Sequence, residues 1–144
     1  MFKKVLVANR GEIAKRIFTA CRELGVASAA IYSEVDANAS WWHSADFAYP
    51  LTGVTASDTY LNQTQLLTIA QANGVDAIHP GYGFLSENAD FAANCAQHGI
   101  KFIGPSPEAM RVMGSKASAR EVAVAAGVPV TPGVDGAGKS DEEL

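Results

Sequence analysis

The sequence predicts an α/β domain in three layers, with a mostly parallel sheet and helices on both of its faces. Short apolar or branched runs alternate along the chain with longer segments whose apolar residues recur at helical spacing. The run at 27–32 is continuous in small and branched residues, which is typical of a parallel strand buried on both faces. At 144 residues, 48% hydrophobic and 18% charged, the composition suits one compact domain.

The expected strands are the short runs at 3–8, 27–32, 47–51, 75–79 and 101–103. Between the first two, a helix carries Ile13, Ile17, Cys21 and Leu24 at helical spacing and ends at Gly25. The segment 36–44 is expected to be a polar loop or a short helix.

Four further helices complete the pattern. One runs over 62–73, and one is capped by Ser86 and turns Phe91 and Cys95 inward. A third has Ser106 at its N-cap and Pro107 as its first residue, and the last covers 116–126. These helices alternate with the strands, as a parallel sheet requires.

Charge and composition restrict the possible partners. A net charge of −4 provides no electrostatic footprint for nucleic acid or an anionic membrane. No apolar window reaches the roughly 20 residues that span a bilayer, and no secretory signal opens the chain. Cys21 and Cys95 both fall in helical patterns, which favours buried thiols in a reducing cytoplasm and no metal site. We therefore expect a cytoplasmic domain over 1–130, followed by a linker over 131–144 that leads to another domain.

The segment His79–Asn88 has the richest chemistry in the chain. It follows an expected strand, and in an α/β protein ligands bind at the carboxyl ends of strands. Gly81 and Gly83 let the chain turn and expose backbone amides, while Tyr82 offers a ring face and a hydroxyl. Glu87 is expected in the first turn of the next helix, stabilised by its dipole. For His79 alone we expect a structural role, with the ring bonded to a backbone carbonyl.

The loop after the first strand argues against two common site types. Asn9-Arg10-Gly11-Glu12 has one glycine where a dinucleotide fingerprint needs three, and it lacks the adjacent acids of a phospho-receiver domain. Asn9 is either a turn residue that caps the following helix or a functional residue. Arg10 and Glu12 are interpreted as a charged pair that fixes the loop beside a second domain.

Two other motifs are weaker. Gly114-Ser115-Lys116 lacks the first glycine and the strand of a P-loop, so a solvated lysine is the default interpretation of Lys116. Trp41 and Trp42 are adjacent and must point apart, so at most one is expected to be buried and the other marks a candidate interface.

Four motifs closely resemble the biotin carboxylase family: Ala8–Ala14, Ser57–Asn62, His79–Asn88 and Phe102–Pro105. The resemblance extends over about residues 1–135. It implies a Rossmann-like amino-terminal (pre-ATP-grasp) domain of the biotin carboxylase subunit or domain of acyl-CoA or related carboxylases. That family uses ATP and Mg²⁺ to activate bicarbonate and then carboxylates biotin on a carrier protein, a phosphoryl-transfer reaction in a site closed to water.

The resemblance also implies residue roles. Lys116 would contact ATP, Tyr82 and Gly83 would lie beside biotin, and Glu87 would support the polar network around the reacting groups. Arg16 and Glu23 would lie at a homodimer face; they are seven residues apart and so on one side of a helix. The sequence departs from the usual family residues at three positions: Thr19 (arginine), Phe47 (an acid) and Ser115 (an acid).

The implied partners are a biotin carboxyl carrier protein or domain, a carboxyltransferase subunit or domain, and a second copy of the parent chain. Because the ATP-grasp machinery of the family would follow residue 144, we expect residues 1–144 to be inactive alone. Two alternatives stay open. One is a stand-alone binding or assembly module that uses the Trp41/Trp42 region and the first helix. The other is a different ATP-grasp ligase, such as a carbamoyl-phosphate type.

Overall fold

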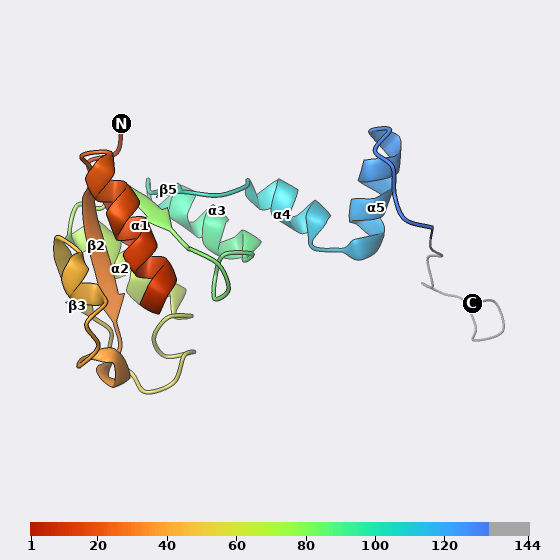
Figure 1. Ribbon diagram of the computed structural model, residues 1–144. Helices are drawn as coiled ribbons and strands as arrows, with labels where there is room; N and C mark the ends of the chain where they lie inside the picture. The colour runs from red at the N-terminus through yellow and green to blue at the C-terminus, as the bar shows by residue number, and fades with distance from the viewer. Residues whose placement is uncertain (133–144) are drawn as a thin grey trace. The chain divides into compact units, whose positions relative to one another are not determined.

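The computed structural model describes residues 1–132, and for Lys116 the backbone alone. The chain divides into two compact units, Met1–Pro107 and Glu108–Leu144. The first unit contains the sheet and the three helices that pack on it (Figure 1). The domain boundary at residue 130 stays a prediction, and residues 133–144 of the expected linker lie outside the described residues.

The sheet has five parallel strands in the order β3-β2-β1-β4-β5. Their bounds are β1 (Lys4–Val7), β2 (Ala27–Tyr32), β3 (Phe47–Pro50), β4 (Ala77–His79) and β5 (Lys101–Phe102). In the register of the sheet, Val7 lies between Ala30 of β2 and His79 of β4. The α/β prediction is confirmed, and each expected strand is present within two residues of its predicted ends.

Helices α1 (Gly11–Glu23), α2 (Gln63–Ala72) and α3 (Ala89–Gln97) connect the strands of the sheet. The chain moves outward from β1 through α1 to β2, whereas α2 and α3 carry it in the opposite direction toward β5. Because such crossovers are right-handed, the reversal puts α1 on one face and α2 and α3 on the other. Figure 1 shows α1 in front of the sheet and α2 behind it.

The core is continuous through the sheet. On the α1 face, Val5 and Val7 of the central strand pack with Ile17, Phe18 and Cys21 of the helix. Leu6 alternates to the opposite face, where Phe91 of α3 meets Phe102 edge to face at 6.0 Å. Cys21 and Cys95 are both buried and free, as predicted. Burial raises the pKa of both thiols, that of Cys95 to about 12, which leaves them unreactive.

Two short helices follow the sheet, α4 (Pro107–Met113) and α5 (Lys116–Ala125). Pro107 is the first residue of α4, as predicted. Ser115 is the N-cap of α5, and its hydroxyl oxygen accepts from the Ser118 N–H at 3.4 Å. Among the described residues, no helix is long and apolar enough to span a membrane.

Two local expectations were wrong. Ser86 does not cap α3; the cap is Asn88, whose side-chain oxygen accepts from the Phe91 N–H at 2.8 Å. Leu24 follows α1 with two thirds of its surface exposed and is not part of the core face. Residues 34–44 contain two short 3₁₀ helices, η1 (Glu34–Asp36) and η2 (Trp42–Ser44), joined by a turn and a bend, in keeping with the loop or short helix expected over 36–44.

Candidate functional site

The candidate site lies where β1 and β4 end side by side at the carboxyl edge of the sheet. These two strands are the topological switch point, because the connections that leave them run in opposite directions. Two loops therefore face each other here. The first contains Asn9 and Arg10 before α1, and the second is the glycine-rich loop, Pro80–Phe84.

Asn9 joins the two loops. Its side-chain nitrogen donates to the carbonyl oxygens of Pro80 and Tyr82, both at 2.7 Å, and its side-chain oxygen accepts from the Arg10 N–H at 2.9 Å. The residue is 4% exposed. Asn9 is thus not the cap of α1: the N-cap position is occupied by Arg10, whose side chain makes no capping hydrogen bond.

The glycine-rich loop has an unusual backbone. Gly81, Gly83 and Phe84 all have left-handed φ angles, of 66°, 69° and 41°. For Phe84 this conformation is strained, and strain of this kind persists only where the surroundings hold it. The Phe84 ring stacks on Tyr60 with the ring centroids 5.2 Å apart, and the next residue, Leu85, is buried. The loop is therefore rigidly supported on its inner side.

His79 supports the same loop from the end of β4. Its Nδ1 accepts from the Gly81 N–H at 3.0 Å, so the expected partner, a backbone carbonyl, is replaced by a backbone amide. Burial lowers the pKa of the imidazole. A neutral ring with an unprotonated Nδ1 is the form that can accept this hydrogen bond. The role of His79 seen here is to hold the loop.

Arg10 has a different partner from the one expected. Its guanidinium forms a two-point ion pair with Asp36, and Glu12 is not involved. The Tyr60 hydroxyl donates to the same carboxylate at 2.6 Å and accepts from the Ser33 N–H at 3.0 Å. Burial by itself would raise the pKa of Asp36, but the hydrogen bonds from Arg10 and Tyr60 outweigh it and lower that pKa.

Sequence reasoning missed Asp36 and Tyr60. One signal could have found Asp36: it follows the end of β2, which is the parallel neighbour of β1, so its loop had to meet the loop of Arg10. Tyr60 lies in the family motif Ser57–Asn62, but between β3 and α2 no local pattern indicated that its hydroxyl meets Asp36.

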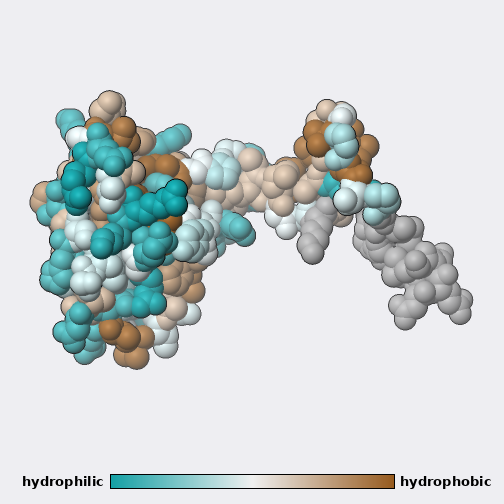
Figure 2. Space-filling view, viewed as in Figure 1, coloured by the Kyte–Doolittle hydropathy of each residue, from teal (hydrophilic) through white to brown (hydrophobic). Residues whose placement is uncertain are grey.

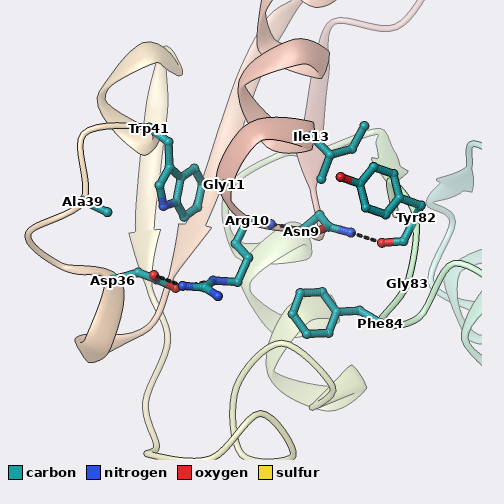
Figure 3. A pocket seen from close by; sticks show the side chains of 10 residues that line it. All are labelled: Asn9, Arg10, Gly11, Ile13, Asp36, Ala39, Trp41, Tyr82, Gly83 and Phe84. Carbon is teal, nitrogen blue, oxygen red and sulfur yellow. Dashed lines mark hydrogen bonds and ion pairs between the residues drawn. The ribbon is translucent and has the colours of Figure 1, made fainter.

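A cleft of about 530 Å³ opens above these loops. Its lining includes Arg10, Asp36, Trp41, Tyr82 and Gly83, and Figure 3 shows the Trp41 and Tyr82 rings on either side of the first turn of α1. Tyr82 is exposed over 64% of its surface. Its hydroxyl lies 3.5 Å from a Glu12 carboxylate oxygen, too far for a strong hydrogen bond. The cleft thus offers flat apolar walls and polar groups at its floor.

Gly83 provides a free polar group in the cleft. Among the described residues its N–H has no hydrogen-bond acceptor, and a Cβ built on it would meet no atom within 4 Å. The amide can therefore donate to a ligand without displacing a protein group. No cluster of acids, histidines or cysteines suited to a metal ion occurs within residues 1–132.

The structure brings together only some of the predicted site residues. Tyr82 and Gly83 share the cleft, while Glu87 is exposed in the turn before Asn88, outside the helical turn where it was expected. Arg16 and Glu23 are exposed on α1. Lys116 is the first residue of α5 in the second unit, and its side chain is outside the described part of the chain.

Neither tryptophan is fully buried. Trp41 stacks on Phe18 with centroids 6.4 Å apart, and Trp42 stacks between Tyr32 and His43 while its indole N–H donates to the Asp36 carbonyl. Both rings therefore support the loop that carries Asp36. A role for either ring in an interface stays a prediction.

Many α/β proteins have a ligand cleft at the carboxyl ends of the strands where the sheet order reverses. Comparison with known proteins identifies the family within this class. Residues 1–110 match the family model described as biotin carboxylase, N-terminal domain. The chain belongs to this family, as its sequence motifs predicted.

Individual relatives agree with the family match. Mitochondrial pyruvate carboxylase of Mus musculus is 55% identical over 92% of this chain and 11% of its own length. Biotin carboxylase 1 of Bacillus subtilis is 50% identical over 99% of this chain and 32% of its own length. The chain therefore spans a third or less of the curated relatives that it matches.

Two solved structures show the biotin carboxylase domain of a thermophilic 2-oxoglutarate carboxylase. The one bound to bicarbonate is 53% identical with a TM-score of 0.88, over 94% of this chain and 30% of that one. The one bound to ADP without magnesium is 52% identical with a TM-score of 0.88, over 99% and 32%.

Proposed function

We propose that this chain is the amino-terminal part of an ATP-dependent biotin carboxylase, which uses bicarbonate to carboxylate biotin on a carrier protein. The observation that carries the proposal is the backbone N–H of Gly83, which faces open space in the cleft. A backbone amide without an acceptor among the described residues lies beside an exposed tyrosine ring, in a domain of the biotin carboxylase family.

The residues present fit the bicyclic ring of biotin. Open space lies over Gly83, whose N–H would donate to the ureido oxygen, and Tyr82 offers a flat face for the ring. Bound biotin supplies the ureido nitrogen that receives the carboxyl group. The task of this loop is to bind and orient that ring, and a rigid loop does this with little loss of conformational entropy.

Lys116 is proposed as the nucleotide contact of this chain. A lysine at the start of a helix can offer a mobile positive charge to a phosphate, near backbone N–H groups. The ADP and bicarbonate found in the related domain support ATP and bicarbonate as substrates. Magnesium ligands and the remaining phosphoryl-transfer groups are expected outside residues 1–144. Glu87, exposed beside the cleft-forming loop, is proposed to support the polar groups around the reacting atoms.

The proposed partners are the carrier, a carboxyltransferase and a second copy of the parent protein, in the cytoplasm. Arg16 and Glu23 are both exposed on α1, in keeping with a dimer face. An apolar groove of about 450 Å³ runs beside Arg16, with Phe2, Ile17 and Leu24 in its lining. Figure 2 shows hydrophobic surface next to the hydrophilic front of α1. Thr19, exposed between the two charged residues, leaves this face with one cation fewer than the family usually has.

The test is a graft of this chain onto Bacillus subtilis biotin carboxylase 1, in place of the 143 residues that align at 50% identity. Bicarbonate-dependent phosphate release from MgATP is measured with and without free biotin. We expect biotin to stimulate release by the graft but not by the isolated chain. A folded graft that binds MgATP and does not respond to biotin would refute the proposal. It would favour a binding module or another ATP-grasp ligase.

A further inference from the structure

The Asn9 side chain meets three backbone groups, and each contact uses a different part of the amide. Both nitrogen hydrogens donate to carbonyls of the glycine-rich loop, at Pro80 and Tyr82, and the oxygen accepts from the Arg10 N–H. No other side chain of this size combines two donors on one atom with an acceptor. The residue is buried, so water does not compete for these bonds.

Gly81 is fitted to Asn9. A Cβ at Gly81 would lie 2.8 Å from the Asn9 side-chain nitrogen and 3.1 Å from its Cγ, and its φ of 66° already disfavours a side chain. The loop can fold over the amide only because this residue has no side chain. The close contact between Asn9 and Gly81 thus sets how near the glycine-rich loop lies to the end of β1.

These contacts decide the direction of the Gly83 N–H. The Tyr82 carbonyl and the Gly83 N–H belong to one peptide unit, and in a trans peptide the two bonds point in opposite directions. Asn9 draws the Tyr82 carbonyl inward, as the dashed line in Figure 3 shows. The Gly83 N–H must then point outward, away from Asn9, where no acceptor among the described residues meets it.

We propose that Asn9 is a positioning residue for the acceptor site: by holding the Tyr82 carbonyl, it aims the Gly83 N–H at the ligand. Asn9 itself does not touch the ligand in this proposal. The inference rests on the proposed function for the identity of that ligand, biotin. The direction of the peptide unit is a property of this chain alone and is tested separately.

The first measurement uses the 144-residue chain and no ligand. Asn9→Asp replaces both donors by an acceptor that faces two carbonyl oxygens. Asn73→Asp is the matched control, because the Asn73 side-chain nitrogen also donates to a carbonyl, that of Ile69 at 2.8 Å, far from the loop in the fold. The N–H residual dipolar coupling of Gly83 is measured against those of β1 and β4. We expect Asn9→Asp to move the Gly83 coupling toward zero and Asn73→Asp to leave the Gly83 coupling unchanged.

Acidification gives an internal rescue. When the introduced carboxyl group is protonated it regains one donor, so the coupling should recover in part at mildly acidic pH. If Asn9→Asp does not fold, Gly81→Ala disturbs the same contact from the other side and should also move the Gly83 coupling. An unchanged Gly83 coupling in a folded variant would overturn the inference.

The second measurement uses the graft. Asn9→Asp should raise the KM for free biotin roughly tenfold, the effect expected for one lost hydrogen bond to a ligand, with the KM for MgATP unchanged. An equal rise in both KM values, or an unchanged KM for biotin, would overturn the inference. If the unmutated graft shows no response to biotin, the proposed function fails, and the dipolar coupling still decides whether Asn9 directs the amide.

Discussion

Removing the charge of Asp36 should destabilise the first unit by about 2 kcal/mol, because this carboxylate is buried and accepts charge-assisted hydrogen bonds. In Asp36→Asn, the remaining side-chain oxygen can still accept from Tyr60. The new amide nitrogen faces the Arg10 guanidinium, and because both groups are donors they cannot form a hydrogen bond. The Arg10 side chain is 48% exposed, so water can hydrate its charge after the pair is broken. That relief keeps the expected cost below the 3–5 kcal/mol typical of a fully buried pair.

Urea unfolding followed by tryptophan fluorescence measures this effect, since both tryptophans of the chain belong to the first unit. The pKa of Asp36 is lowered in the folded state, so its stabilisation is present above the unfolded value near 3.9 and is lost as the pH falls through the folded value. The difference between the wild type and Asp36→Asn should therefore be largest at pH 7 and shrink below about pH 4.

Asp58→Asn is the matched control. Asp58 is exposed, and its carboxylate accepts from the N–H and hydroxyl of Thr55 in a surface turn. We expect a smaller loss of stability from this change than from Asp36→Asn. A difference between wild type and Asp36→Asn that is the same at pH 7 and pH 3 would refute the reasoning, because it would show that the charge of Asp36 carries none of the effect.

Three further predictions concern the first unit. Asn88→Ala should cost about 1 kcal/mol in urea unfolding, while Ser86→Ala should cost little, since Asn88 is the cap of α3; the reverse order would contradict the observed cap. Tyr60→Phe should cost about 1.5 kcal/mol in the same assay, because the Ser33 N–H loses its acceptor; an unchanged midpoint would contradict this. The thiol of Cys95 should react with Ellman's reagent only at the rate of unfolding, and faster labelling in native conditions would show that it is accessible.

The sheet was predictable because each strand is a continuous apolar run that ends in a polar or glycine residue. Such runs occur where a parallel strand is covered on both faces, and the sequence of β2 shows this most clearly, with Ala27–Tyr32 confirmed at both ends. The first helix was predictable for a similar reason, since Ile17 and Cys21 repeat on the face that meets β1. Leu24 was assigned to that face by spacing alone, but it lies past the last helical residue.

The start of α3 could not be predicted from the segment Ser86-Glu87-Asn88, which contains two good capping residues. The structure selects Asn88 because the chain makes further turns first: the Ser86 N–H donates to the Gly83 carbonyl, and the Asn88 N–H donates to the Leu85 carbonyl. These turns bury Leu85 and place Phe91 against the core. The choice depends on tertiary packing, which a local capping rule does not contain.

The charged partner of Arg10 was assigned wrongly because sequence proximity suggested Glu12. Asp36 is 26 positions away, but β1 and β2 are parallel neighbours, so the loops that follow them meet at one edge. Topology thus determines the pair.

The strained residue of the site explains why three strand ends are needed to build it. Phe84 has a φ of 41°, a conformation that costs of order 1–3 kcal/mol and that the loop alone would not keep. From β1, Asn9 holds the carbonyls of Pro80 and Tyr82; from the β2 side, Asp36 fixes the hydroxyl of Tyr60, on whose ring Phe84 stacks. The strand that carries the loop, β4, adds the His79 contact to Gly81. Because each support acts on a different residue of the loop, Asn9→Asp should redirect the Gly83 amide while Asp36→Asn should not. The two losses of stability should not add fully, because both residues contact Arg10: Asn9 accepts from its N–H, and Asp36 pairs with its guanidinium.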